Sequence, residues 1–279
     1  MKKLMFVAAA LAAGVVAYGL ESANTVGYDT VAINSVSRYS GGATFVPVGG
    51  GDTITLGDFI AIDMDPDSDY IQILDTSDTS VLNRYVYFSK ELADALNEDE
   101  NTTEYTALIG WWEADEVGDT SRDAAQLPVG QGWLLANGSG SDIKFQYNGE
   151  VPMETTQVET LGVARPFIAN ILPRAVTLGE IVIDEFDPDS DYLQELDTSD
   201  TSVINRYTYF PQALADDLNA DENTDEYDAL VGWWVTDEVG EEGSECNNVS
   251  VPTGKAFLGA CGSGASWVVK FPPAVVPQN

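Results

Sequence analysis

The sequence DPDSDYIQILDTSDTSVLNRYVYF, residues 65–88, returns with few changes as DPDSDYLQELDTSDTSVINRYTYF, residues 187–210. Over the longer segments Asp65–Gly118 and Asp187–Gly240, at a constant offset of 122, 40 of 54 positions are identical. Self-similarity of this extent indicates one structural unit used twice. We therefore expect two copies of one fold in this chain.

The segments before this repeat are less alike. Residues 43–64 and 165–186 share only 4 of 22 positions at the same offset. We therefore expect the copies to superpose from the acidic DPDSDY turn through the GWW sequence and to diverge before that turn.

Each copy contains patterns of short strands and one helix. The run Val81–Phe88 presents an apolar face on each side and is rich in β-branched and aromatic residues, which is typical of an inner strand. KELADALN (residues 90–97) and PQALADDLN (residues 211–219) place leucines four apart, which predicts one short helix per copy. GWLLANGSGSDIKFQY, residues 132–147, predicts a closing hairpin. The fold class that fits is all-β and mainly antiparallel, as two tandem β-sandwich-like or small-barrel repeats.

The N-terminal sequence MKKLMFVAAALAAGVVAYG has a basic start, an apolar run and small residues at the spacing that a signal peptidase recognises. We interpret residues 1–19 as a cleaved signal peptide, followed by repeat one at residues 20–151 and repeat two at residues 152–279. The alternative, a membrane anchor, needs about 20 apolar residues, and this run has fewer. No later stretch of the sequence is long and apolar enough to span a membrane. We therefore expect an exported protein, extracellular or at the cell surface.

The chain is strongly acidic. Subtracting Lys2 and Lys3 from its 12 basic residues leaves 10, against 46 acidic residues, so the processed chain has a net charge of −36. This charge excludes nucleic acid as a natural partner and disfavours an anionic membrane surface. A hydrophobic content of 44% with six tryptophans still allows each repeat to bury a core, so the chain is no disordered acidic tail.

Both cysteines, Cys246 and Cys261, lie in repeat two and have no cysteine counterpart in repeat one. Because they occur only as a pair and the expected compartment is oxidising, we expect a disulfide that stabilises the fold by about 3 kcal/mol. A zinc site would need more thiols or histidines, and the sequence has no histidine.

The acidic turn is the candidate metal site. Carboxylates alternate along each DPDSDY sequence, and alternate carboxylates in a turn can converge on one calcium ion. The candidate calcium ligands are Asp65, Asp67, Asp69, Asp187, Asp189 and Asp191. Tyr70 stands where an EF-hand loop needs glycine, so the turn is no EF-hand. The competing interpretation is a solvated acidic turn.

The tryptophan pairs Trp111–Trp112 and Trp233–Trp234 are candidate carbohydrate-binding residues, since exposed indoles stack on sugar faces. Neighbours in a strand point to opposite faces, so one indole of each pair is expected to fill the core instead. Arg84 and Arg206 lie within otherwise apolar strands, where an ion pair with a nearby aspartate is the expected role.

Catalytic patterns are weak in this sequence. Serine-hydrolase chemistry usually needs histidine, and the chain has neither histidine nor a nucleophile elbow or phosphate-binding loop. Paired carboxylates hydrolyse glycosides at separations of about 5 to 9.5 Å, but 46 acidic residues single out no pair. We therefore expect a protein that is not an enzyme.

Five motifs carry a resemblance to a known group of proteins. ESANTVGY, FVPVGGGDTITLGDF, YVYF, GWW and PVGQGWLLANGSGS occur in this order along nearly the whole chain. In this it resembles a family of exported bacterial β-rich proteins without an established biochemical activity. The resemblance implies a surface or matrix protein and carries over no catalytic or binding residues.

These observations favour an exported structural protein. Duplication presents one surface twice, which suits self-association, a filament or contact with a cell-surface or matrix polymer. The alternative is a carbohydrate-binding module, with calcium as its possible cofactor. Burial of all four paired indoles would count against that alternative.

Overall fold

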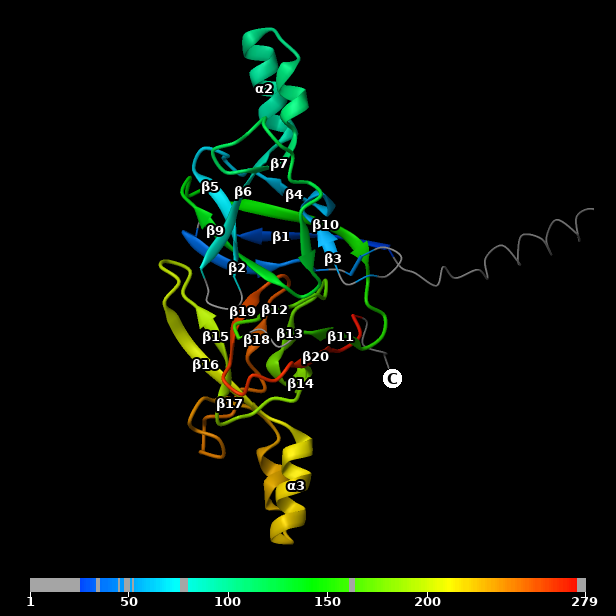
Figure 1. The fold of residues 1–279 in the computed structure, drawn as a ribbon, viewed down its shortest axis with the longest axis vertical. Coiled ribbons are helices and arrows are strands. Elements are labelled where there is room, and N and C mark those ends of the chain that lie inside the picture. Colours follow the sequence, from blue (N-terminus) through cyan, green and yellow to red (C-terminus); the bar gives the residue numbers. More distant parts are fainter. Residues whose placement is uncertain are drawn as a thin grey trace, which may run out of the picture.

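The computed structural model describes residues 26–33, 36–44, 46–47, 51, 53–75, 80–160 and 164–274. The expected signal peptide, residues 1–19, lies outside the described residues. Figure 1 shows two β-rich bodies stacked along the long axis of the molecule, with one helix at each end. None of the helices within the described ranges has the length and apolar character needed to cross a membrane.

In its described residues, copy one consists of strands with a single α-helix and two short 3-10 helices. Its elements are β1 Val26–Ile33, β2 Arg38–Gly42, β3 Thr53–Thr55, η1 Leu56–Asp58, β4 Phe59–Ile62, β5 Asp69–Leu74, β6 Val81–Phe88, α2 Lys90–Glu100, η2 Glu104–Leu108, β7 Gly110–Glu113, β8 Gln126–Pro128, β9 Gly132–Asn137 and β10 Ile143–Glu150.

Copy two has the same elements in the same order. They are β11 Thr156–Glu159, β12 Phe167–Ala169, β13 Val176–Thr177, η3 Leu178–Glu180, β14 Val182–Asp184, β15 Asp191–Leu196, β16 Val203–Phe210, α3 Gln212–Glu222, η4 Glu226–Leu230, β17 Gly232–Val235, β18 Ser250–Val251, β19 Ala256–Cys261 and β20 Val268–Phe271.

The sheets of the two copies have one topology. Copy one forms the sheets β1-β10-β4, β2-β9-β5-β6-β7 and β3-β8, and copy two forms β11-β20-β14, β12-β19-β15-β16-β17 and β13-β18. Every strand pair in these sheets is antiparallel. The prediction of an all-β, mainly antiparallel fold with short helices is confirmed.

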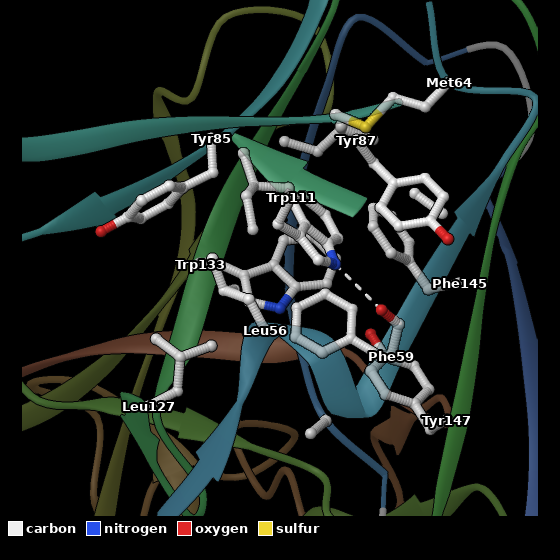
Figure 2. Close-up of a cluster of buried hydrophobic side chains, with 14 of the residues drawn as sticks. Leu56, Phe59, Met64, Tyr85, Tyr87, Trp111, Leu127, Trp133, Phe145 and Tyr147 are labelled. Atoms are coloured by element: carbon white, nitrogen blue, oxygen red, sulfur yellow. Dashed lines mark hydrogen bonds between the residues drawn. The ribbon is translucent and has the colours of Figure 1, made fainter. Parts of the chain in front are cut away.

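The core of copy one lies between its three-stranded and five-stranded sheets, as in a sandwich. Phe145 of β10 meets Trp133 of β9 with ring centroids 4.6 Å apart, and Phe59 of β4 meets Trp111 of β7 at 5.0 Å. The indole N–H of Trp111 also donates to the carbonyl of Phe59 at 2.9 Å (Figure 2). Aromatic side chains from both sheets therefore join the two layers.

The expected hairpin over residues 132–147 is wrong. β9 pairs with β2 and β5 in one sheet, whereas β10 pairs with β1 and β4 in the other. The glycine-rich turn between these strands crosses from one layer to the next. A two-residue alternation predicts strands well, but it does not determine which strands pair.

In each copy the helix packs against one end of the five-stranded sheet, at the end of the molecule far from the other copy (Figure 1). Ser89 caps α2, its hydroxyl accepting the N–H of Leu92 at 3.1 Å, and Asn101 ends the helix in the left-handed conformation with φ of 50°. Ala93 of α2 packs on Trp112 and Val86 of the sheet. Both predicted helices are confirmed, and each continues three residues beyond its predicted C-terminal boundary.

Part of the low identity before the acidic turn comes from a difference in length. Twelve residues separate Gly42, the end of β2, from Thr55, which caps η1. Seven residues separate the equivalent Ala169 and Thr177. A constant offset therefore aligns nonequivalent residues before Thr55, whereas Thr55–Met64 and Thr177–Phe186 are equivalent and share 3 of 10 positions. The divergence in sequence does not extend to the topology of the strands.

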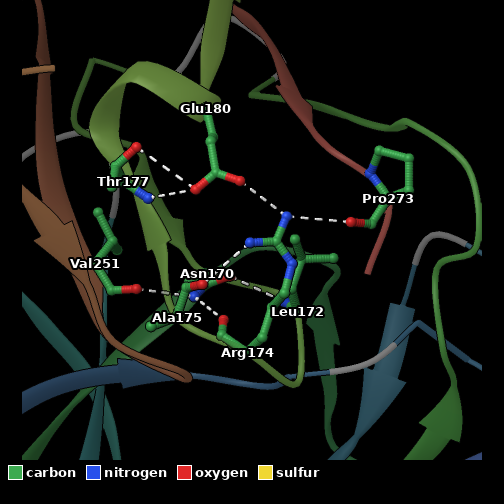
Figure 3. Close-up of polar contacts among 8 residues, drawn as sticks. All are labelled: Asn170, Leu172, Arg174, Ala175, Thr177, Glu180, Val251 and Pro273. Carbon is green, nitrogen blue, oxygen red and sulfur yellow. Dashed lines mark hydrogen bonds and ion pairs between the residues drawn. The ribbon is translucent and has the colours of Figure 1, made fainter. Parts of the chain in front are cut away.

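In copy two a polar cluster fixes the shorter connection after β12 (Figure 3). The side-chain amide of Asn170 donates to the carbonyls of Arg174 and Val251 at 2.9 and 3.1 Å. Arg174 donates to Glu180 at 3.0 Å and to the carbonyl of Pro273 at 3.2 Å. These bonds tie the connection to the residues that follow β20.

The two copies contact each other through equivalent elements. The N–H of Gly42 donates to the carbonyl of Gly254 at 3.0 Å, and the N–H of Ala169 donates to the carbonyl of Gly130 at 3.0 Å. An apolar cluster covers the same boundary and consists of Leu74, Leu134, Phe167, Ala169, Leu196, Ala256 and Leu258. Reciprocal contacts of this kind are those of a two-fold dimer, here formed within one chain.

Candidate functional site

Asp69 is buried at the start of β5 and binds two turns together. Its carboxylate accepts the N–H of Asp65 at 2.9 Å, which closes the acidic turn. It also accepts both the N–H and the hydroxyl of Ser139 at 2.8 Å, from the turn between β9 and β10. The carboxylate is therefore a structural clasp between segments far apart in the sequence.

Asp191 forms the same clasp in copy two with one further donor. It accepts the N–H of Asp187 at 3.0 Å and the N–H and hydroxyl of Ser263 at 2.9 Å. The indole N–H of Trp267 donates to it at 2.9 Å. Four donors thus satisfy one buried carboxylate.

The remaining carboxylates of the acidic turn are either bonded within the turn or exposed. Asp65 accepts the N–H of Asp67 and the hydroxyl of Ser68, and Asp187 makes the equivalent bonds in copy two. Asp67 and Asp189 are exposed. Across the described ranges, no three acidic or thiol side chains come together in a way that could hold a metal ion. The calcium interpretation of this turn therefore has no geometric support.

Arg84 and Arg206 stack on tyrosines. The guanidinium carbon of Arg84 lies 5.2 Å from the ring centroid of Tyr70, and that of Arg206 lies 5.3 Å from the centroid of Tyr192. Among the described residues, a cation–π contact stands where the sequence suggested an ion pair with an aspartate, and each tyrosine follows the buried aspartate on the neighbouring strand.

All four paired tryptophans are buried. Trp111 and Trp233 lie in the cores, and their indole N–H groups donate to the carbonyls of Phe59 and Ile181, both at 2.9 Å. Trp112 and Trp234 lie beneath the helices and donate to the carbonyls of Leu108 and Leu230. The indole faces are thus not available to a sugar, and this result counts against the carbohydrate-binding interpretation.

The expected disulfide between Cys246 and Cys261 is wrong, since both cysteines are buried free thiols. Cys246 lies beyond β17 at the edge of the five-stranded sheet, where its backbone N–H donates to the carbonyl of Trp233. Cys261 ends β19, and β15, β16 and β17 lie between them in the sheet. Neighbouring strands are about 4.8 Å apart and a disulfide needs Cα atoms within about 7 Å, so this separation is too large.

Each cysteine instead replaces a polar residue of copy one. Cys246 occupies the position of Arg122, which forms an ion pair with Glu113 in copy one. In copy two Val235 stands at the position of Glu113, so apolar or thiol side chains replace both members of the ion pair. The thiol of Cys261 donates to the carbonyl of Ala265 at 3.0 Å, where the Asn137 amide donates to Ser141 at 2.7 Å. The two substitutions are therefore independent of each other.

The most unusual surface feature is an exposed apolar pair in each copy. Val81 and Leu82 of β6 are 43% and 57% exposed, and Val203 and Ile204 of β16 are 40% and 51% exposed. A β-bulge at this point makes Leu82 and Ile204 the extra residues of their strands. A bulge often redirects a side chain outward.

These pairs lie beside an open side of the sheet. β7 pairs with β6 only from Tyr85 onward. One further hydrogen bond runs from the N–H of Ala114 to the backbone carbonyl of Arg84. Within the described part of the chain, no strand lies beyond Val81–Asn83 on that side. β17 leaves Val203–Asn205 uncovered in the same way among the described residues.

We name these surfaces patch one and patch two. Patch one forms a shallow, open depression of about 300 Å³ and consists of Val81, Leu82, Asn83, Arg84, Glu113, Ala114 and Asp115. Patch two consists of the equivalent residues Val203, Ile204, Asn205, Arg206, Val235, Thr236 and Asp237. Each patch combines aliphatic side chains with an exposed arginine stacked on tyrosine, and arginine and tyrosine are residue types enriched in binding hot spots.

Comparison with known proteins gives no further guide to function. No family model matches this chain, and no curated protein or solved structure shows significant similarity to it. The function must therefore be argued from the chain's own surfaces.

No local sequence pattern predicts the two patches. The sequence favours an inner strand throughout Val81–Phe88, but β5 pairs with Val81–Tyr85 and β7 pairs with Tyr85–Phe88, so in these described ladders only Tyr85 has a strand partner on both sides. The available signal was length, because this strand has eight residues and the GWW strand that covers it has four. A short neighbour leaves the rest of a long strand uncovered.

Proposed function

We propose that this protein is an exported structural protein that associates with further copies of itself through patch one and patch two. The observation that carries the proposal is that both copies expose an apolar pair beside an uncovered strand segment. Scattered exposed apolar residues are ordinary, but an adjacent pair flanked by an arginine and repeated in both copies favours an interaction surface.

The charge of the protein supports self-association at these surfaces in particular. A net charge of −34 makes copies of the chain repel each other over most of their surface. Patch one contains Arg84 together with Glu113 and Asp115. A surface with both signs of charge can pair with another copy without bringing only like charges together.

Two patches per chain allow association to continue beyond one contact. A molecule that binds a neighbour through one patch keeps the other for a second neighbour, which suits a filament or a surface layer. The N-terminal sequence supports an exterior location for such an assembly. The buried, hydrogen-bonded carboxylates of both acidic turns support a structural role rather than a catalytic one.

Analytical ultracentrifugation of the processed chain over a range of concentrations tests the proposal, with negative-stain microscopy of the same samples. The double substitution Leu82→Asp with Ile204→Asp should reduce the protein to monomers at concentrations where the unsubstituted protein associates. Met153→Asp is the matched control, because Met153 is 46% exposed and lies outside both patches. An unsubstituted protein that stays monomeric at high concentration would contradict the proposed function.

A further inference from the structure

The patches differ from each other, and we infer that patch one of one molecule binds patch two of another. This inference rests on the proposed function and specifies the partner of each surface. Like-with-like contacts, in which patch one meets patch one and patch two meets patch two, are the alternative.

The two patches share an exposed aliphatic side chain and differ at their border. Leu82 of patch one is 57% exposed and Ile204 of patch two is 51% exposed, so each patch presents one aliphatic projection. Patch one is a shallow, open depression bordered by Glu113, Ala114 and Asp115, and in patch two the apolar Val235 replaces Glu113. A contact between two different surfaces of the same molecule is heterologous and can continue from one molecule to the next.

The charges near the patches favour the unlike pairing. Between equivalent positions, Ile73 becomes Glu195, Ser121 becomes Glu245 and Arg122 becomes Cys246, each of which makes patch two more negative. The changes from Glu113 to Val235 and from Asp123 to Asn247 act in the other direction, and the longer turn of copy two adds Glu242. The surroundings of patch two are therefore two charges more negative than those of patch one.

The carboxylate of Glu195 is held in place at patch two. It accepts the side-chain N–H of Asn205 at 2.7 Å and the hydroxyl of Tyr207 at 3.0 Å. Contact between two copies of patch two would bring two such carboxylates together. Contact with patch one would bring Glu195 toward Arg84 and the ion pair of Arg122 with Glu113 instead of toward a second Glu195 carboxylate.

Mixing two variants that each lose one patch tests the pairing. Leu82→Asp removes patch one and leaves patch two, and Ile204→Asp removes patch two and leaves patch one. Both side chains are more than half exposed, so both variants should fold. Val81→Asp and Val203→Asp form a second pair of variants for the same experiment.

Unlike pairing predicts that each variant alone is a monomer and that an equal mixture forms a complex of twice the monomer mass. The measurement is sedimentation velocity of each variant and of the mixture, with circular dichroism as the check on folding. If each variant alone forms dimers through its remaining patch, the inference is overturned and the proposed function stands. If the unsubstituted protein itself remains monomeric, the proposed function fails.

Discussion

Gly42 and Ala169 are equivalent residues at the ends of β2 and β12, and they face each other across the boundary between the copies. A Cβ added to Gly42 would lie 2.3 Å from the Cβ of Ala169. Gly132 and Ala256, also equivalent, repeat this relationship, with a corresponding distance of 2.8 Å. Equivalent residues meet each other only near a two-fold axis. Each pair along this local axis has room for one methyl group.

Gly42→Ala should therefore lower the free energy of unfolding by about 2 kcal/mol, because a second methyl group overpacks the boundary. Ala169→Gly should cost about 1 kcal/mol through backbone entropy and a small cavity. Combining both substitutions moves the methyl group to the other copy and should recover most of the loss. Urea denaturation of the three variants tests this, and a double variant less stable than Gly42→Ala alone would contradict the two-fold relationship.

The clasp predicts an order of stability among three aspartates. Asp191→Asn should cost about 3 kcal/mol, since it removes a buried charged acceptor bonded to four donors, including Trp267. Asp69→Asn should cost less, because its carboxylate binds one donor fewer. Asp67→Asn should change stability by less than about 0.5 kcal/mol, since Asp67 is exposed. Thermal unfolding of the three variants gives the order, and equal losses at Asp67 and Asp191 would be inconsistent with the clasp.

Calcium should have no specific effect on stability. The carboxylates of the two acidic turns bind backbone N–H groups and serine hydroxyls, and Asp67 and Asp189 point to solvent without further carboxylates gathered around them. We expect millimolar calcium to raise Tm no more than sodium chloride of equal ionic strength, by charge screening alone. A calcium-specific increase that is lost in Asp67→Asn with Asp189→Asn would restore the calcium site.

The fold class was predictable because its signals are local. Alternating side chains identified β6, and leucines four apart identified α2 and α3. Strand pairing was harder to predict from the sequence, since the turn after Asn137 has the residue pattern of a hairpin turn. The contacts that send β9 and β10 into different sheets include the bond from Ser139 to Asp69, 70 residues away in the chain.

The candidate sites were less predictable, because each depended on burial or on a distant partner. Trp112 was expected to be exposed if Trp111 filled the core, but α2 covers it. The two cysteines suggested a bond, whereas each replaces a polar residue at a separate place in the sheet. The exposed pair at Leu82 arises from a bulge that no local pattern indicates.

Cys246 and Cys261 should remain free thiols in the folded protein. Burial raises the pKa of the Cys246 thiol, and the negative charges of Glu238 and Glu245 raise it further. Because the thiolate is the reactive form, iodoacetamide should modify Cys246 far more slowly in the folded protein than in urea at the same pH. Cys261→Asn should be tolerated, because asparagine makes the equivalent bond in copy one. Detection of a peptide that joins both cysteines in non-reduced protein would contradict this account.

The contact between Arg174 and Glu180 should make stability depend on pH in the acidic range. Burial alone would raise the pKa of Glu180, but the N–H of Thr177 and the guanidinium of Arg174 outweigh it and lower the pKa below 4.5. A carboxyl group with a lowered pKa in the folded state contributes stability above its unfolded pKa, and this contribution is lost as the pH falls through the folded value. The difference in Tm between the unsubstituted protein and Glu180→Gln should therefore be largest near pH 6 and shrink toward pH 3. In the background of Arg174→Gln the same substitution should show a weaker dependence on pH, because the ion pair is already absent. A difference in Tm that stays constant from pH 6 to pH 3 would show that Glu180 acts through packing alone.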